Sequence, residues 1–323
     1  MKKILSAALC ALLLLTLLSA CRAGGTEGDT LSVVVTIFPE YDWVMNLLGG
    51  ESDAVRVTLL LDNGVDLHSY QPTVDDIVTV SGCDLFIYVG GESDEWVDDV
   101  LREARNKEMV VLNLLSVLGD AAKEEALLEG MEDEAEEDEE GEKGPEYDEH
   151  IWLSLRSAAL CVRAIEKELS ALDPDRALTY AANAAAYLDQ LAALDAEFAA
   201  AVAASPKNAL LFADRFPFRY LADDYGLTCY AAFSGCSAES EASFETVAFL
   251  AGKVDELGLH TVLTLESGDG RIAETVVAAS QAKNAAIRTM DSMQSTTSAD
   301  VKAGATYLSI MKKNLDALRA ALQ

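Results

Sequence analysis

Hydrophobic and polar positions follow two alternating patterns along most of this 323-residue chain. Short runs rich in β-branched residues, such as LSVVVTI at 31–37 and DLFIYVG at 84–90, predict buried strands. Amphipathic stretches lie between such runs, and several end at glycine, as 73–82 does. Strand and helix alternate in this way over 31–114 and again over 208–322. This spacing predicts parallel sheets whose strands are joined by crossover helices.

A long segment rich in alanine and leucine separates the two alternating regions. Asp173 and Pro174 fit an N-cap followed by proline at the first helical position, and neither glycine nor proline interrupts the segment before Ser205. About thirty helical residues span roughly 45 Å, enough to cross a whole molecule. We therefore predict two similar α/β lobes joined by one rigid helix. The predicted divisions are an N-terminal lobe at 31–172, a linking helix at 173–206 and a C-terminal lobe at 207–323.

The first thirty residues have the pattern of an export signal and a tether. Two lysines precede an apolar run that is short for a membrane span and that ends in LLSAC. The ending resembles a bacterial lipobox, so we predict a signal peptide at 1–20, lipidation of Cys21 and a tether at 21–30. The mature chain is then expected on the outer face of the bacterial cytoplasmic membrane, held by its lipid.

Charge narrows the choice of partners. The net charge is −31 at pH 7, and it becomes −33 when Lys2 and Lys3 leave with the signal. Such a surface repels nucleic acid and attracts cations. Thirteen acidic residues lie between Glu129 and Glu149, inside a predicted loop at 124–149. Two interpretations of this loop stay open, a solubilising segment and a weak collector of cations at the mouth of a site.

The cysteines do not form a pattern typical of a disulfide framework or of a structural zinc site. After loss of the signal and lipidation of Cys21, four thiols remain, and they are widely spaced. Cys229 and Cys236 flank a six-residue segment, so they are the one candidate pair for a disulfide. The alternative is that both are free thiols.

Residues with metal-binding side chains follow several predicted strands. Ligand sites in open α/β sheets lie at the carboxyl ends of the strands, so these residues are expected near one another. Imidazole together with carboxylate suits zinc or manganese. His260 precedes a strand and is set aside as an ordinary surface or packed residue. The candidates are His68, Asp214, Glu266 and Asp291 after strands, and His150 at the helix start after the acidic loop; Arg215 follows Asp214.

Six segments together resemble a known family over nearly all of the mature chain. They are VTIFPEYDWVMNLLGG, GVDLHSYQPTVDDI, CDLFIYVGGESDEWVDDVL, DEHIWLS, FRYLADDYGL and GATYLSIMKKNLDALRAAL. In this order they are similar to the zinc and manganese substrate-binding lipoproteins of ABC transporters, the ZnuA/TroA-like family (cluster A-I), which includes adhesin-type lipoproteins. The resemblance implies the TroA-like periplasmic-binding-protein fold. The acidic loop lies where zinc-binding members carry a loop rich in histidine and aspartate.

The resemblance also implies metal ligands at His68, at His150 and at Asp291. The family's third ligand, a histidine or a glutamate, falls on Arg215, which stays protonated and cannot bind a metal. Two explanations stay open. Asp214, Glu266 or water completes the site, or Arg215 forms a salt bridge with Asp291 and the site is altered.

The expected function is therefore that of a monomeric extracytoplasmic receptor that binds zinc in the cleft between lobes and delivers it to an ABC permease. A manganese receptor and an adhesin-type lipoprotein with a degenerate site are the alternatives from the same family. An exported zinc hydrolase is disfavoured, because the chain has neither HExxH nor GxSxG. We expect no enzymatic activity.

Overall fold

The computed structural model describes residues 30–50, 53–125, 127–131, 146–237 and 241–323. The predicted signal peptide, Cys21 and most of the acidic loop lie outside these residues. Within them the chain forms two four-stranded parallel sheets, in the orders β2-β1-β3-β4 and β6-β5-β7-β8. The strands are β1 Leu31–Val35, β2 Val55–Leu59, β3 Leu85–Tyr88, β4 Val110–Asn113, β5 Ala209–Phe216, β6 Thr228–Ser234, β7 Thr261–Leu265 and β8 Ala286–Met290.

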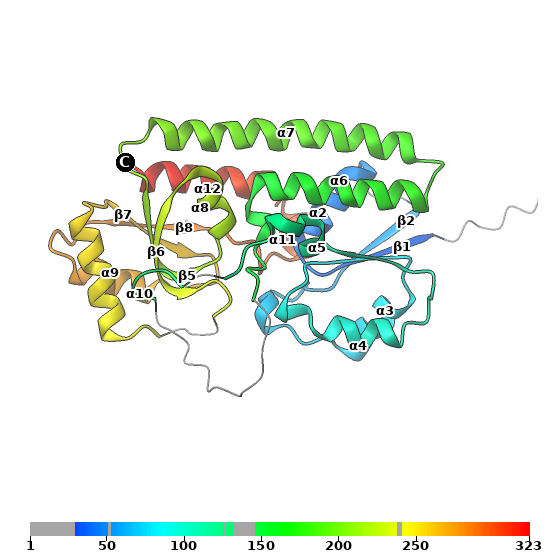
Figure 1. Ribbon diagram of the computed structural model, residues 1–323, viewed down its shortest axis with the longest axis horizontal. Helices are drawn as coiled ribbons and strands as arrows, with labels where there is room; N and C mark the ends of the chain where they lie inside the picture. Colours follow the sequence, from blue (N-terminus) through cyan, green and yellow to red (C-terminus); the bar gives the residue numbers. More distant parts are fainter. Residues whose placement is uncertain (1–29, 51–52, 126, 132–145, 238–240) are drawn as a thin grey trace, which may run out of the picture.

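The two sheets therefore have the same strand order, and the predicted fold class of two similar α/β lobes is confirmed. Helices connect the strands and cover the sheets (Figure 1). They are α2 Phe38–Leu48, α3 Val74–Gly82, α4 Trp96–Arg102, α5 Leu114–Leu118, α6 Leu155–Leu172, α7 Ala177–Ala204, α8 Arg219–Tyr225, α9 Phe244–Glu256, α10 Arg271–Ala279, α11 Ser298–Lys302 and α12 Tyr307–Ala321. Among these described helices none is long and apolar enough to cross a membrane.

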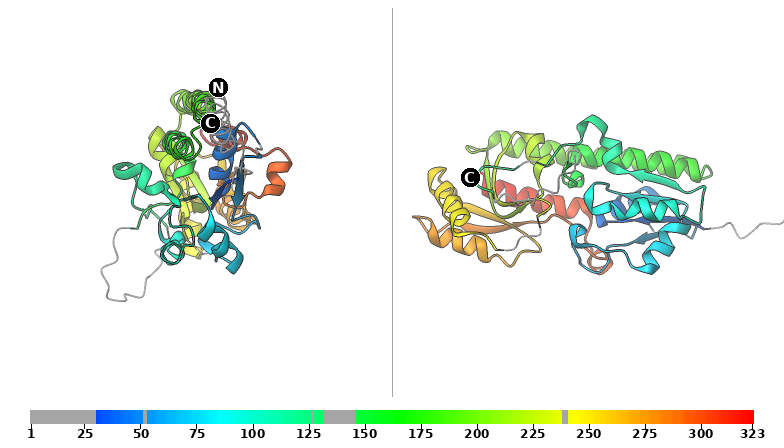
Figure 2. Two further views of the ribbon diagram at one scale, coloured as in Figure 1. Left: turned by 90° about the vertical axis from the view of Figure 1, so that its right-hand side faces the viewer. Right: turned by 60° about the horizontal axis from the view of Figure 1, so that its bottom comes forward.

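Helix α7 runs past both sheets and packs against α2, α6, α8 and α12 (Figure 1). Figure 2 shows the same long helix beside both lobes from another direction. Its 28 residues span about 42 Å, close to the predicted length of the connector. Because α7 contacts helices from both halves of the chain, it limits how far the two lobes can move apart.

Three local predictions differ from the structure. Asp173 does not cap α7: residues 174–176 form a turn, the N-cap is Arg176, and the Asp173 carboxylate accepts hydrogen bonds from Arg176 and Tyr180. The amphipathic stretch at 298–322 predicts one helix, but it forms two, because Gly304 has φ of +100° and ends the first of them. Strand β5 continues past its expected end and includes Arg215.

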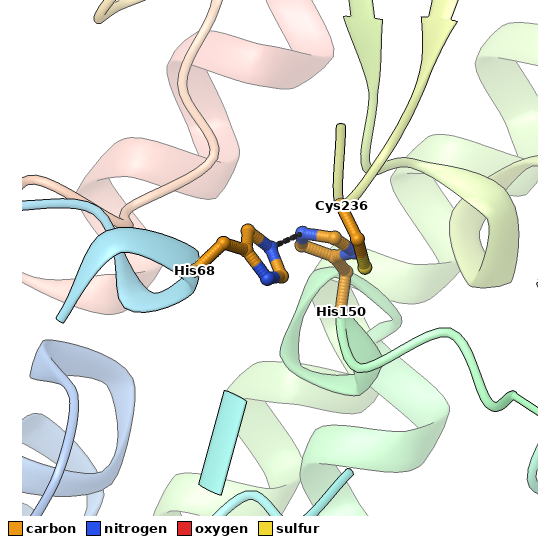
Figure 3. Close-up of side chains that lie close together, drawn as sticks. All are labelled: His68, His150 and Cys236. Carbon is orange, nitrogen blue, oxygen red and sulfur yellow. Dashed lines mark hydrogen bonds between the residues drawn. The ribbon is translucent and has the colours of Figure 1, made fainter. Parts of the chain in front are cut away.

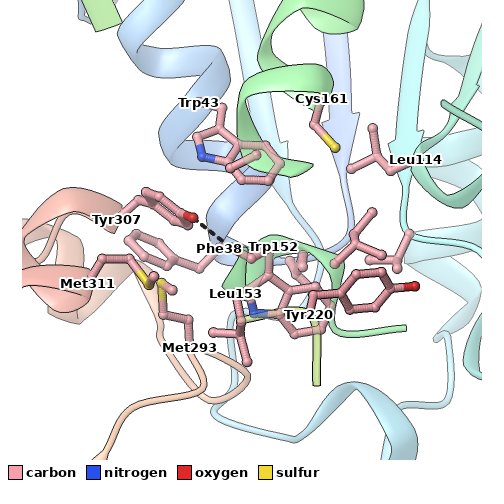
Figure 4. Packing of buried hydrophobic residues seen from close by; sticks show 14 of the residues in the cluster. Phe38, Trp43, Leu114, Trp152, Leu153, Cys161, Tyr220, Met293, Tyr307 and Met311 are labelled. Carbon is pink, nitrogen blue, oxygen red and sulfur yellow. Dashed lines mark hydrogen bonds between the residues drawn. The ribbon is translucent and has the colours of Figure 1, made fainter. Parts of the chain in front are cut away.

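One apolar core joins the two lobes. It contains Trp43 of the first half and Tyr307 of the second, whose rings meet edge to face at 5.4 Å between centroids. Figure 4 shows Trp152 beside them, and the Tyr307 hydroxyl donates a hydrogen bond to its carbonyl at 2.6 Å. The indole of Trp152 in turn donates to the carbonyl of Ser292 at 2.8 Å. These contacts place the end of β8, which Ser292 follows, at the junction of the lobes.

Candidate metal centre

His68 lies at the junction of the lobes on a short 3-10 helix, Leu67–Ser69, which follows β2. Asp66 caps this helix, and its Oδ1 accepts a hydrogen bond from the His68 amide at 3.1 Å. The Nδ1 atom of His68 is 2.8 Å from the Ser93 hydroxyl and 3.5 Å from Glu149 Oε2. These contacts fix the imidazole ring through Nδ1 and leave its Nε2 atom to face His150.

His150 is completely buried and is held in the same manner. It precedes the 3-10 helix Ile151–Leu153, and its amide donates to Asp148 Oδ1 at 2.9 Å. The same carboxylate oxygen is 3.0 Å from the Nδ1 atom of the ring. A carboxylate behind the imidazole is the usual support of a metal-binding histidine, because it fixes the tautomer and makes the other nitrogen a better ligand.

The Nε2 atoms of His68 and His150 face each other at 3.0 Å (Figure 3). When Nδ1 of each ring carries the proton for its acceptor, two lone pairs meet, and a cation between them removes the repulsion. Two nitrogens bound to one tetrahedral zinc ion lie roughly 3.3 Å apart, given the usual Zn–N distance of about 2.0–2.1 Å. The observed separation is therefore close to what a shared metal requires.

The pKa values of the two histidines also reflect how close their rings lie. Burial, and then the neighbouring His150, lower the pKa of His68 to about 3. Burial also acts to lower the pKa of His150, but the Asp148 carboxylate outweighs it and raises that pKa above its usual value. A pKa this low leaves His68 neutral around neutral pH and able to bind a metal.

Cys236 is the third metal-binding side chain at this place. It follows β6 in the second half of the chain, and Figure 3 shows it beside both histidines. One ligand atom from each of His68, His150 and Cys236 lies within 4.8 Å of the others, and the described residues contain no other group of this kind. Cys236 had been considered only as the disulfide partner of Cys229. Both are free thiols in the structure.

Arg215 does not pair with Asp291. Its guanidinium Nη2 atom is 2.7 Å from Asp66 Oδ2, in a salt bridge between the second and first halves of the chain that is only about 15% exposed. Burial alone would raise the pKa of Asp66, but Arg215 and His68 together lower it below its usual value. The arginine thus holds the residue that caps the helix of His68, rather than the fourth expected ligand.

The three candidate carboxylates belong to the second half and lie outside the cluster of His68, His150 and Cys236. Asp214 lies within β5, whereas Glu266 and Asp291 directly follow β7 and β8. Asp214 accepts hydrogen bonds from the amides of Arg215 and Leu265. Both oxygens of Glu266 accept from Ser292, and Asp291 accepts from the Met293 amide. Burial, and then Asp291, raise the pKa of Glu266 to about 7. Coordination by these three residues stays a prediction.

Comparison with known proteins adds independent information. A family model described as "Zinc-uptake complex component A periplasmic" matches residues 33–321. The zinc-binding lipoprotein AdcA of Streptococcus pneumoniae is 33% identical over 325 residues, which cover 99% of this chain and 61% of that protein. The high-affinity zinc uptake system protein ZnuA of Bacillus subtilis is 28% identical, covering 95% of this chain and 94% of its own length. The chain thus spans about three fifths of the streptococcal relative.

Solved structures show the same relation. The Zn(II)-bound ZnuA-like domain of Streptococcus pneumoniae AdcA superposes with a TM-score of 0.70 at 28% identity, over 91% of this chain and 99% of that domain. The periplasmic zinc-binding protein TroA of Treponema pallidum superposes with a TM-score of 0.72 at 24% identity, over 91% of this chain and 99% of its own. The second likeness bears on the fold alone.

Proposed function

The chain belongs to the family of periplasmic zinc-uptake components A, and from that premise we propose that it is the receptor of a zinc importer. In this role it binds one zinc ion where the two lobes meet, at His68 and His150, and delivers the ion to an ABC permease. The family consists of substrate-binding transport components, not enzymes. Zinc is here the cargo and not a resident cofactor.

The facing Nε2 atoms of His68 and His150 are the observation that carries the proposal. Each ring is supported at Nδ1 by a hydroxyl or a carboxylate, so both present their metal-binding nitrogen to the same point. Two imidazoles with sulfur or oxygen atoms nearby suit zinc better than they suit manganese, which favours oxygen ligands. The residues around the pair therefore support zinc as the cargo.

Capture is expected to need little closure of the lobes. The apolar core spans both halves, and α7 packs against helices from each of them. Such a frame resists a wide hinge motion, so the histidine pair is nearly in place before the ion arrives. Release to a permease then requires only a local change at the loops that carry His68 and Cys236, which reach the ion from opposite lobes.

The membrane attachment is proposed from the sequence. LLSAC supports lipidation of Cys21, with the receptor held as a monomer on the outer face of the cytoplasmic membrane next to its permease. Incorporation of a labelled fatty acid tests this directly. The label is expected in the native chain and lost in Cys21→Ala, and equal labelling of both would contradict the anchor.

Calorimetric titration of the metal-free chain with zinc, and then with manganese, tests the proposed function. We expect one tight zinc equivalent and much weaker binding of manganese. His68→Ala and His150→Ala each remove a ligand, so each is expected to weaken zinc binding by more than ~100-fold, beyond the effect of losing an outer-shell partner. His260→Ala is the matched control, because His260 is exposed and lies outside the cluster.

Two results would overturn the proposal. One is weak binding at several sites that survives both histidine substitutions, which would place the cations on the acidic loop alone. The other is tight binding that His260→Ala weakens as much as His68→Ala does.

A further inference from the structure

The thiol of Cys236 has the position that a metal ligand from the second lobe requires. His68 and His150 both belong to the first half of the chain, and Cys236 is the member of their cluster that the second half contributes. It lies in the turn immediately after β6, at the carboxyl end of a parallel strand, where ligand sites occur in α/β sheets. Figure 3 shows Cys236 beside His150, with His68 on the other side of the His150 ring.

The turn approaches His150 so closely that only glycine fits before the cysteine. A Cβ atom on Gly235 would lie 2.9 Å from the carbonyl oxygen of Phe216 and 3.0 Å from Cε1 of His150. Both distances are shorter than ordinary contacts of a Cβ atom, and one of the atoms is backbone. Gly235 therefore allows the backbone to pass against the Cε1 and Nδ1 atoms of the imidazole, and the next side chain, Cys236, lies beside the histidine pair.

Two further contacts fix the turn beside the cluster. The Cys236 amide donates to Glu125 Oε1 at 3.3 Å, a residue of the first half. On the other side, Nη1 of Arg215 is 3.5 Å from the carbonyl oxygen of Ser237. Arg215, which occupies the position of a family ligand but cannot bind a metal, thus lies next to the residue that follows the cysteine. The sulfur is available close to the place where a third ligand is missing.

We infer that Cys236 is the third protein ligand of the cargo metal, so that zinc is bound by two imidazoles and one thiolate. The inference rests on the proposed function, since it concerns the same ion. Binding forms a zinc–sulfur bond and breaks the S–H bond, and the thiol proton passes to the buffer. The fourth position is left to water or to a carboxylate. A thiolate is a soft ligand, so this site takes zinc, cobalt or cadmium and rejects manganese.

Cobalt reports on sulfur coordination directly, because a cobalt–thiolate bond gives an intense charge-transfer absorption in the near ultraviolet that imidazole and carboxylate ligands do not give. The experiment compares the full chain with Cys236→Ser, each titrated with Co²⁺ alone and then with zinc. Cys229→Ser is the matched control, since Cys229 is also a free cysteine of the second lobe but lies outside the cluster. The native chain and Cys229→Ser are expected to show the band with one equivalent of cobalt, and Cys236→Ser to lack it.

Zinc affinity is the second measurement to make on the same proteins. Cys236→Ser is expected to bind zinc at least ~10-fold more weakly than the native chain, at the low end of the losses seen when the support of a metal site is removed. Cys236→Asp replaces the soft ligand by a hard one and is expected to narrow the preference for zinc over manganese. The number of protons released per zinc, measured in buffers of different ionisation enthalpy, is expected to fall in Cys236→Ser.

The outcomes separate this inference from the proposed function. If the native chain binds zinc through His68 but shows no cobalt–thiolate band, the inference is wrong and the receptor proposal stands. The same conclusion follows if Cys236→Ser keeps both the band and the zinc affinity. If the native chain binds zinc only weakly and independently of His68, both fail. The band of the native chain decides the question even where a variant does not fold.

Discussion

The two halves of the molecule have the same strand order but differ in the charge that they bury. Among the described residues, the second half (207–323) buries only uncharged polar side chains, which are serine, threonine, glutamine and asparagine. The first half (31–172) buries six carboxyl or imidazole side chains, each at most 7% exposed: Glu40, Asp42, Asp94, Asp148, Glu149 and His150. The same sheet topology thus carries a buried acidic region in one lobe and a neutral one in the other.

This difference indicates that the two lobes contribute different chemical groups to the binding of a cation. Removing a carboxylate from water disfavours its charged form, and burial accordingly raises the pKa of Glu40 above its usual range and that of Asp94 to about 7. A cation nearby offsets part of this cost. The first lobe therefore provides an anionic environment with two imidazoles, and the second lobe adds Arg215 and Cys236 from outside it.

The largest expected effect of this buried charge is on stability, at a residue far from the metal centre. Asp42 lies on α2 facing α7, where Tyr187 donates a hydrogen bond to it at 3.2 Å, and burial raises its pKa from 3.8 to about 6. An acid with a raised pKa binds its proton more tightly in the folded state, so stability falls as pH rises from about 4 to about 6. At ~1.4 kcal/mol per pKa unit, the contribution is up to about 3 kcal/mol.

Urea unfolding of the metal-free chain between pH 4.5 and pH 8 measures this contribution. Asp42→Asn keeps the shape and cannot ionise, so it is expected to gain stability relative to the native chain as pH rises through 6. Asp189→Asn, on the exposed face of the same helix pair, is expected to follow the native curve. A native chain and an Asp42→Asn variant whose stabilities differ by a constant amount at every pH would contradict the account.

The next effect concerns the carboxylate behind His150. Asp148→Asn keeps a hydrogen-bond acceptor near Nδ1 but removes the charge that strengthens Nε2 as a ligand. We expect zinc affinity to fall ~10–100-fold, with the fold unchanged by circular dichroism. Asp269→Asn, an exposed aspartate in the second lobe, provides the control and is expected to leave affinity unchanged. Unaltered zinc binding by Asp148→Asn would remove the distinction between the acidic lobe and the neutral one.

Most of the fold could be predicted from the sequence, because the periodicity of buried strands and amphipathic helices is local. The strands lie in short apolar runs between amphipathic stretches, as the sequence pattern predicts, and β1 and β3 fall within the runs at 31–37 and 84–90. The missed features depend on single residues whose role is set by context. Gly304 interrupts the last helix through its positive φ. Asp173 does not cap α7, because its carboxylate accepts hydrogen bonds from the side chains of Arg176 and Tyr180.

The site was less accessible to sequence reasoning. His68 and His150 could be chosen because each lies beside a strand end or a helix start in a chain with three histidines. Cys236 was missed, because its nearness to His150 arises from packing across the lobes and no sequence spacing encodes it. The sequence does contain one signal for it. Gly235 and Cys236 directly follow a strand, and ligand sites in α/β sheets lie at the carboxyl ends of strands. The partner of Arg215 is likewise set by packing between segments far apart in the sequence: its salt bridge is with Asp66 and not with Asp291.

The smallest expected effect concerns Arg215, the positively charged side chain of the second lobe that contacts the first lobe. The salt bridge between Arg215 and Asp66 is the contact to test, since both side chains are only about 15% exposed. A double-mutant cycle of Arg215→Met, Asp66→Asn and the double variant isolates their interaction from the other effects of each substitution. Urea unfolding at low and high salt provides the free energies.

We expect a coupling free energy of about 1–2 kcal/mol that changes little with salt, because a partly buried ion pair is screened less than an exposed one. The pair Arg271–Asp269 is the control: its side chains are 85% and 62% exposed, so its coupling is expected to stay within about 0.5 kcal/mol. Equal couplings for the two pairs would mean that Arg215 is an ordinary surface charge. A larger coupling for Arg215 would assign it the role of joining the lobes, at the position where the family resemblance implies a ligand.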